Sequence, residues 1–274
     1  MFAIYKKQLQ KTWYFWLIPI LLIVALAFYM VLIWPEFEPI IQEFQSLLEN
    51  PLYQALLGEG AIELGITSFE GLISMEMFIV CDIMFIGFIL AFGTLIVARE
   101  ADTGTLDIML SYPIPRWKFL LQKLLAFITV TLAFPILTWL VTTLAASSYD
   151  ITFNNEAFLI SLFSRWVLYM TLTSIAILCS IIFMDSTKTI GSSGLILGGS
   201  FILERIGGLV RPASAETADI LQGISLFHYL DGPTVMNNIM NNKGFPLGEL
   251  LIIILIGVLA LLISLVLFQK REFK

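Results

Sequence analysis

Six long apolar stretches dominate this sequence, and they restrict the folds open to it more than any other feature. They lie near residues 16–34, 75–98, 120–146, 157–184, 189–210 and 249–268. At about 1.5 Å per residue, each is long enough to cross the hydrocarbon core of a bilayer as a helix. The sequence therefore predicts an all-α polytopic membrane protein with six transmembrane helices in a single transmembrane domain, residues 1–274.

The composition supports a chain that lives in a membrane. Hydrophobic residues make up 58% of it and charged residues only 13%, about half the charged fraction of a typical soluble domain. Cys81 and Cys179 both lie in apolar stretches, at different expected depths, so we expect no disulfide between them. The third stretch contains Pro135, which is expected to kink that helix.

Basic residues predict the orientation. An even number of spans places both termini on one side of the membrane. Eleven of the basic residues then lie on that side and four on the other. The eleven are Lys6, Lys7, Lys11, Arg99, Arg116, Lys118, Lys123, Lys188, Lys270, Arg271 and Lys274; the four are Arg165, Arg205, Arg211 and Lys243. Because cytoplasmic loops of membrane proteins are enriched in Lys and Arg, we expect both termini in the cytosol.

Two external loops follow from this topology, at residues 35–74 and 211–247. The first carries apolar residues at helical spacing from Phe37 to Leu48, with glutamates between them, and is predicted to form an amphipathic helix. That helix either packs on its own protein or binds a partner. In the second loop, the segment from Ile220 to Leu230 is apolar enough to enter the membrane partway and return as a re-entrant helix.

A polar segment of residues 99–116 interrupts the apolar stretches on the predicted cytosolic side. It concentrates charge, glycine and proline, and its residues Leu106, Met109 and Leu110 give a short helix an apolar face that Pro113 would end. Such a helix suits insertion into a groove on a cytosolic partner. The alternative is an ordinary structured loop.

This segment resembles the cytosolic loop of ABC-2 type permeases, the membrane subunits of one class of ABC exporters. The matching residues are Glu100-x-x-x-Gly-Thr-Leu, then Leu110-Ser-Tyr-Pro-Ile-Pro-Arg and Lys123-Leu-Leu. The basic start from Phe2 to Leu9 is similar to the interfacial N-terminal helix of that family, and Ser225–Asp231 is similar to the element before its last span. The resemblance covers essentially the whole chain.

The resemblance implies that loop 99–118 is the coupling loop that seats on a nucleotide-binding subunit. The residues it assigns to ATPase coupling are Glu100, Asp102, Gly104, Thr105, Leu106, Pro113 and Arg116. The chain has no Gly-x-x-x-x-Gly-Lys-Ser/Thr motif, so ATP and Mg would bind to a separate ATPase, and this chain is expected to be no enzyme by itself and to bind no cofactor or metal. Two permeases and two ATPase subunits would assemble in the plasma membrane of a prokaryote, in contact with lipid and with no nucleic acid.

Two further features carry functional expectations. Gly194 and Gly198 form a Gly-x-x-x-Gly pattern in the fifth span, which allows another helix to approach closely. That helix belongs either to the same subunit or to a second permease, and the implied pairing of permeases favours the second.

Charged residues in the outer third of the membrane are the other feature. The set comprises Glu76, Asp82, Arg165, Glu204 and Arg205. Charges at such depth are costly unless they are paired, so we expect an ion pair of Asp82 with Arg165 or Arg205. The pair would be either a structural clamp or part of a gate or substrate contact near the outer exit.

The expected function is therefore the permease subunit of an ATP-driven exporter, which forms the translocation pathway. Two other classes of membrane protein are alternatives. An ion-driven secondary transporter would use the membrane charges, but the sequence shows no inverted repeat and no pair of broken helices. A non-transporting membrane sensor or immunity protein would use the acidic external helix to bind a ligand.

Overall fold

The computed structural model describes residues 3–43, 68–106 and 115–271. Within these ranges, six helical segments are long and apolar enough to cross a membrane. They are Trp13–Phe37, Phe69–Asp102, Arg116–Ser148, Asn155–Phe183, Ser186–Val210 and Leu247–Lys270. The predicted all-α fold with six candidate membrane-spanning helices is confirmed.

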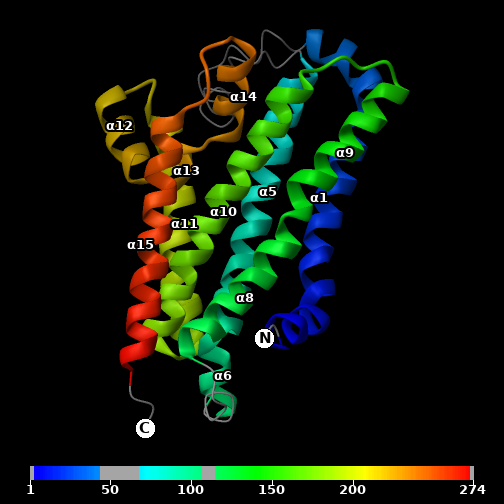
Figure 1. Ribbon diagram of the computed structural model, residues 1–274. Helices are drawn as coiled ribbons and strands as arrows, with labels where there is room; N and C mark the ends of the chain where they lie inside the picture. Colours follow the sequence, from blue (N-terminus) through cyan, green and yellow to red (C-terminus); the bar gives the residue numbers. More distant parts are fainter. Residues whose placement is uncertain (1–2, 44–67, 107–114, 272–274) are drawn as a thin grey trace.

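Helix α1 is longer than the first span. It runs from Ala3 to Glu43 and contains Pro19, Pro35 and Pro39. A proline within a helix removes one backbone hydrogen bond, and the helix bends there without having to end. The first turns of α1 lie across the direction of its long middle part (Figure 1). The described part of the expected external amphipathic helix thus continues α1, and the rest of that helix, from residue 44, lies outside the described residues.

The second span changes its helical type at its inner end. Helix α5 (Phe69–Gly93) continues without a break into the π-helix η1 (Thr94–Ala98) and then into α6 (Arg99–Asp102). Ser68 caps the start of α5, where its hydroxyl accepts a hydrogen bond from Gly71 N. Short π-helical segments inside α-helices are frequent at functional sites, and this one leads directly into the predicted coupling loop.

The third span consists of α8 (Arg116–Thr131) and α9 (Ala133–Ser148), which meet at Leu132. Pro135 lies in the first turn of α9 and has no N–H to donate to the carbonyl four residues earlier. The regular helix is interrupted at Leu132, within one turn of Pro135, where the sequence predicts a kink.

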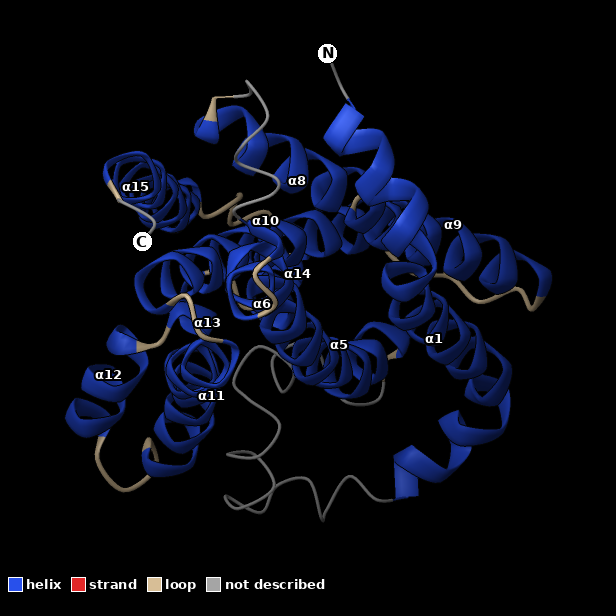
Figure 2. Ribbon diagram, turned by 90° about the horizontal axis from the view of Figure 1, so that it is seen from below, coloured by secondary structure: helices blue, strands red, loops and turns tan. Residues whose placement is uncertain are grey.

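Helix α10 (Asn155–Phe183) is the centre of the bundle. It contacts α5, α9, α11 (Ser186–Val210), α14 (Gly232–Met240) and α15 (Leu247–Lys270). Figure 2 shows α5 and α10 between α1 and α9 on one side and α11 and α15 on the other. Close packing needs glycine at one contact of α10, because a Cβ on Gly93 would lie 2.7 Å from the Cβ of Ala176.

The loop before the last span folds into short helices at one end of the bundle. These are α12 (Ala215–Ile224), α13 (Leu226–Tyr229) and α14. Both chain ends and α6 lie at the opposite end (Figure 1). We call the end with α6 the inner end and the end with α12–α14 the outer end. Assignment of the inner end to the cytosol rests on the distribution of basic residues.

Candidate functional site

An inner polar cluster joins the polar segment to the spans. Lys123 of α8 is only 1% exposed, and its Nζ donates a hydrogen bond to the carbonyl oxygen of Ile96 in η1 at 2.7 Å. The same Nζ lies 2.6 Å from Glu100 Oε1 and 4.4 Å from the centre of the Phe119 ring. A buried ammonium needs such partners, because an unpaired charge in this environment is strongly unfavourable. The contact fixes α6 and the π-helix to α8.

The first part of the loop reaches a second helix. The Asp102 carboxylate accepts a hydrogen bond from Ser186 N at 2.8 Å, at the first residue of α11, where a negative charge is favoured. Gly104 has a φ of +67°, which favours glycine. The next two residues differ in exposure: Thr105 is exposed, whereas Leu106 is 2% exposed and packs in the core of this chain.

The end of the loop reaches two more helices through arginine side chains. Arg116 Nη1 donates to the carbonyl oxygens of Phe268 at 3.2 Å and Arg271 at 2.5 Å, at the end of α15. Arg271 Nη1 in turn donates to the carbonyl oxygens of Ile181 and Ile182, at 2.6 and 2.8 Å, at the end of α10. Cations stabilise helix C-termini because the last carbonyl groups lack partners within the helix.

The described ends of the predicted coupling loop therefore hold the inner ends of α8, α10, α11 and α15 together. Of the residues that the family resemblance assigns to coupling, Glu100, Asp102 and Arg116 make these contacts. Pro113 lies in 107–114, outside the described residues. Leu106 is buried in the core of this chain, and its part in ATPase coupling stays a prediction.

A buried polar cluster lies nearer the outer end. Asp82 of α5 and Arg165 of α10 are 0% and 1% exposed, and Arg165 Nη2 lies 2.9 Å from Asp82 Oδ2. Tyr169 Oη donates to the other carboxylate oxygen of Asp82 at 2.9 Å. Arg205 of α11 approaches the carboxylate as well, with its Nη2 3.9 Å from Asp82 Oδ2. The structure thus contains the ion pair that the sequence predicts, with both of the arginines considered.

Arg165 also holds the chain between α13 and α14. Its Nη1 donates to the carbonyl oxygens of Phe227 at 3.3 Å and Leu230 at 2.8 Å, and its Nη2 lies 3.3 Å from Asp231 Oδ1. Asp231 caps α14, since its other carboxylate oxygen accepts from Thr234 N and Thr234 Oγ1. One buried guanidinium therefore joins α5, α10 and the segment at the outer end.

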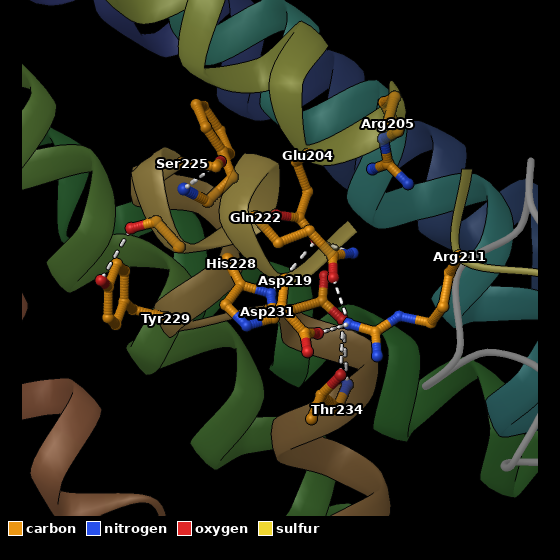
Figure 3. Close-up of polar contacts among 12 residues, drawn as sticks. Glu204, Arg205, Arg211, Asp219, Gln222, Ser225, His228, Tyr229, Asp231 and Thr234 are labelled. Atoms are coloured by element: carbon orange, nitrogen blue, oxygen red, sulfur yellow. Dashed lines mark hydrogen bonds and ion pairs between the residues drawn. The ribbon is translucent and has the colours of Figure 1, made fainter. Parts of the chain in front are cut away.

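Figure 3 shows an outer polar cluster around Glu204, Gln222 and His228. Glu204 Oε1 accepts from Gln222 Nε2 at 3.3 Å and lies 3.5 Å from His228 Nδ1. Gln222 also accepts from Arg211, whose Nη2 lies 3.1 Å from Asp219 Oδ1. These contacts connect the end of α11 with α12 and α13.

His228 is the titratable group of this outer cluster. The side-chain contact with Glu204 raises the pKa of His228 above its ordinary value of 6.5, against the opposing effect of partial burial. Asp231 acts in the same direction as Glu204, whereas Arg211 opposes it. Protonation of the imidazole thus strengthens the connection between α11 and α13.

Sequence reasoning found part of these clusters. Glu76 is exposed and makes no ion pair with the other described residues, whereas Glu204 belongs to the outer cluster. Tyr169, Asp231 and Arg271 were not expected as site residues, and Lys123 entered only through the family resemblance, with no role assigned to it. A buried lysine or tyrosine is not visible in a sequence, although the charge of Asp231 beside an apolar segment is a usable signal.

The glycines of α11 leave space in this chain. A Cβ at Gly194 would meet only Leu90 Cδ1, at 3.8 Å, and a Cβ at Gly198 would meet nothing within 4 Å. Leu195 and Ile196 beside them are 78% and 41% exposed. Gly198 thus serves no close packing among the described residues.

Comparison with known proteins identifies the family. Among the described residues, no group of three or more His, Cys, Asp or Glu side chains is placed to hold a metal ion. A search of curated proteins and a search of solved structures found no match. A family model described as "ABC-2 family transporter protein" matches residues 2–273, nearly the full chain. The chain therefore belongs to the ABC-2 family of transporter membrane proteins.

Proposed function

We propose that this chain is the permease subunit of an ATP-driven exporter and that it docks a separate ATPase subunit through residues 99–118. The observation that supports this proposal most is the inner polar cluster. A loop that served only as a connection would not need charged side chains that hold the ends of α8, α11 and α15 and, through Arg271, that of α10. ATP and Mg would bind to the ATPase, and two copies of each subunit would form the transporter.

The contacts suggest how force on the loop reaches the spans. Glu100 and Asp102 connect the beginning of the loop to α8 and α11, and Arg116 connects its end to α15 and, through Arg271, to α10. Closure of the ATPases would therefore displace these inner ends as a group. The π-helix η1, which Lys123 holds through Ile96, is the place where the second span can bend.

The second permease copy would pack against α11. The open space at Gly198 and the exposed side chain of Leu195 support this arrangement, because small residues at helix interfaces in membranes let backbones approach closely. The substrate would cross between the two permeases.

Ion coupling is a weaker alternative for the buried charges. The Asp82 carboxylate already receives the guanidinium of Arg165 and the hydroxyl of Tyr169 from its own chain. A carboxylate that is neutralised in this way favours a structural or gating role over the binding of a coupling ion.

The test is co-expression of this chain with a candidate ATPase subunit from the same genome, followed by co-purification and an assay of ATP hydrolysis. We expect a stoichiometric complex that hydrolyses ATP. Thr105→Arg should release the ATPase without unfolding the chain, since Thr105 is exposed, whereas Leu106→Asp would also place a charge in the core. Thr217→Arg, at an exposed threonine of the outer end, is the matched control and should leave the complex intact. A chain that binds no ATPase, or a complex indifferent to Thr105→Arg, would contradict the proposal.

A further inference from the structure

The outer segment from Leu226 to Met240 packs on the spans with buried apolar side chains such as Phe227 and Met236, and its buried charged contacts with them converge on one side chain, Arg165. Arg165 binds two of its carbonyl oxygens and the carboxylate of Asp231. Arg165 itself is held from the other side by Asp82. Removal of the carboxylate of Asp82 or of Asp231 leaves the buried guanidinium of Arg165 with fewer partners, which is strongly unfavourable.

The same segment covers one face of α5. A Cβ at Gly232, the first residue of α14, would lie 2.7 Å from the Phe78 ring, so α14 begins directly on that face. Cys81 lies one helical turn after Phe78 and next to Asp82, and it is 0% exposed. Because Phe78, Cys81 and Asp82 lie within one turn on the same face of α5, and α14 begins on Phe78, we expect movement of the segment away from α5 to uncover the thiol of Cys81 and the carboxylate of Asp82.

Asp82 has a second cation within reach. Arg205 Nη2 lies 3.9 Å from the carboxylate oxygen that Arg165 binds, and the Nε of Arg205 is buried with no hydrogen-bond partner. Arg205 is 28% exposed and lies over the ring of Phe201 in α11. A small shift of α11 would let Arg205 replace Arg165 at Asp82, so that the carboxylate stays paired while Arg165 is released.

We propose that Asp82, Arg165 and Asp231 form a latch that holds the outer segment closed over α5, and that Arg205 is the alternative partner of Asp82 when the latch opens. Arg165 and Asp231 are thus positioning residues for the outer mouth of the transporter. This inference rests on the proposed function only for what drives the opening; the closed latch is a property of this chain alone.

The test follows the modification of Cys81 by a membrane-impermeant methanethiosulfonate added from the outer side to full-length chain in membranes. Mass spectrometry would resolve Cys81 from Cys179, which lies at the inner end of α10, is 5% exposed and serves as the internal reference. Asp231→Asn removes one arm of the latch. We expect modification of Cys81 to accelerate about tenfold, the scale of losing one charged hydrogen bond, with Cys179 unchanged.

Asp219→Asn is the matched control, because Asp219 is an outer-end carboxylate that pairs with Arg211 and does not contact Arg165. It should leave modification of Cys81 at the wild-type rate. Arg165→Lys is the second latch variant: it keeps the charge but lacks the planar fork that reaches Asp82, Asp231 and the carbonyl groups at once, and it should also accelerate modification. Wild-type rates in both latch variants, or equal acceleration in Asp219→Asn, would overturn the latch.

A second arm adds ATP to the chain in complex with its ATPase. ATP should accelerate modification of Cys81 in the wild type and much less in Arg205→Gln, which lacks the alternative partner while ATP hydrolysis continues. Equal acceleration in Arg205→Gln would overturn the exchange of partners. Failure of the proposed function is distinguishable, since absence of any ATPase complex leaves the first arm unaffected.

Discussion

Loss of the contact between Lys123 and Glu100 should cost a large and predictable part of the stability of the chain. Removal of one partner from a buried ion pair costs about 3–5 kcal/mol, because the other charge is left unpaired. The two partners differ in exposure, since the side chain of Lys123 is 1% exposed and that of Glu100 is 19% exposed. The free energy of unfolding should therefore depend on which partner is removed.

Lys123→Met leaves the Glu100 carboxylate without its cation on a side chain that is 19% exposed, although its Oε2 is buried, and we expect the loss to lower the free energy of unfolding by about 2 kcal/mol. Glu100→Gln leaves the buried ammonium with Ile96 O and a neutral amide, and it should cost about 3 kcal/mol. The double variant leaves no unpaired charge and should cost no more than either single variant. The coupling energy of the pair is then at least about 3 kcal/mol.

The assay is thermal unfolding of the purified chain in detergent for the wild type, both single variants and the double variant. At about 2–4 °C per kcal/mol, the single variants should lower Tm by roughly 5–10 °C. Single variants with the Tm of the wild type, or a double variant whose loss equals the sum of the single losses, would refute the reasoning. The double variant also separates a role in stability from a role in coupling. If this variant is stable but the bound ATPase no longer responds to the permease, the contact transmits force between the two subunits.

Other predictions concern packing, pH and assembly. Gly93→Ala should lower Tm by roughly 5 °C, because the new Cβ would clash with α10. Gly87→Ala in the same helix places its Cβ in open space and should not lower Tm. Equal effects of the two substitutions on Tm would contradict the packing of Gly93 on α10. Because the contact with Glu204 raises the pKa of His228, this contact stabilises the outer end fully below pH 6.5 and is lost as the pH rises through the raised value. His228 is 43% exposed, so His228→Gln should remove a pH-dependent gain of no more than about 0.5 kcal/mol, measured as Tm between pH 6 and 8; an unchanged pH profile would count against the contact. Gly198→Trp should leave the Tm of the single chain unchanged and reduce cross-linked dimers, and a full yield of dimers would place the interface elsewhere.

The sequence predicts the spans well because membrane helices are long and uniformly apolar. All six predicted spans correspond to helices, and the third is interrupted close to Pro135, since both features follow from local chemistry. The continuation of α1 through Pro35 could not be predicted in the same way. A proline costs one backbone hydrogen bond, and whether the helix ends there depends on packing against distant segments.

The polar clusters, too, depend on distant segments that the sequence does not place. The cost of charge in a membrane predicts that Asp82 is paired with an arginine, but not that Arg165 also binds Phe227 O and Leu230 O. Such contacts depend on where a distant segment folds back. For Leu106 the sequence suggested a contact with another protein, because the residue lies on the apolar face of a predicted short helix. The structure instead buries Leu106 in the core of its own chain.

The most direct test of the central claim is photo-cross-linking from the loop to the ATPase. A photoreactive amino acid would replace Thr105 or, as the control, Thr217 at the outer end, in cells that produce this chain with the ATPase subunit that co-purifies with it. We predict an adduct of this chain with the ATPase from position 105 and none from position 217. An ATPase that co-purifies but forms no adduct at position 105, or forms adducts equally at both positions, would contradict docking through this loop.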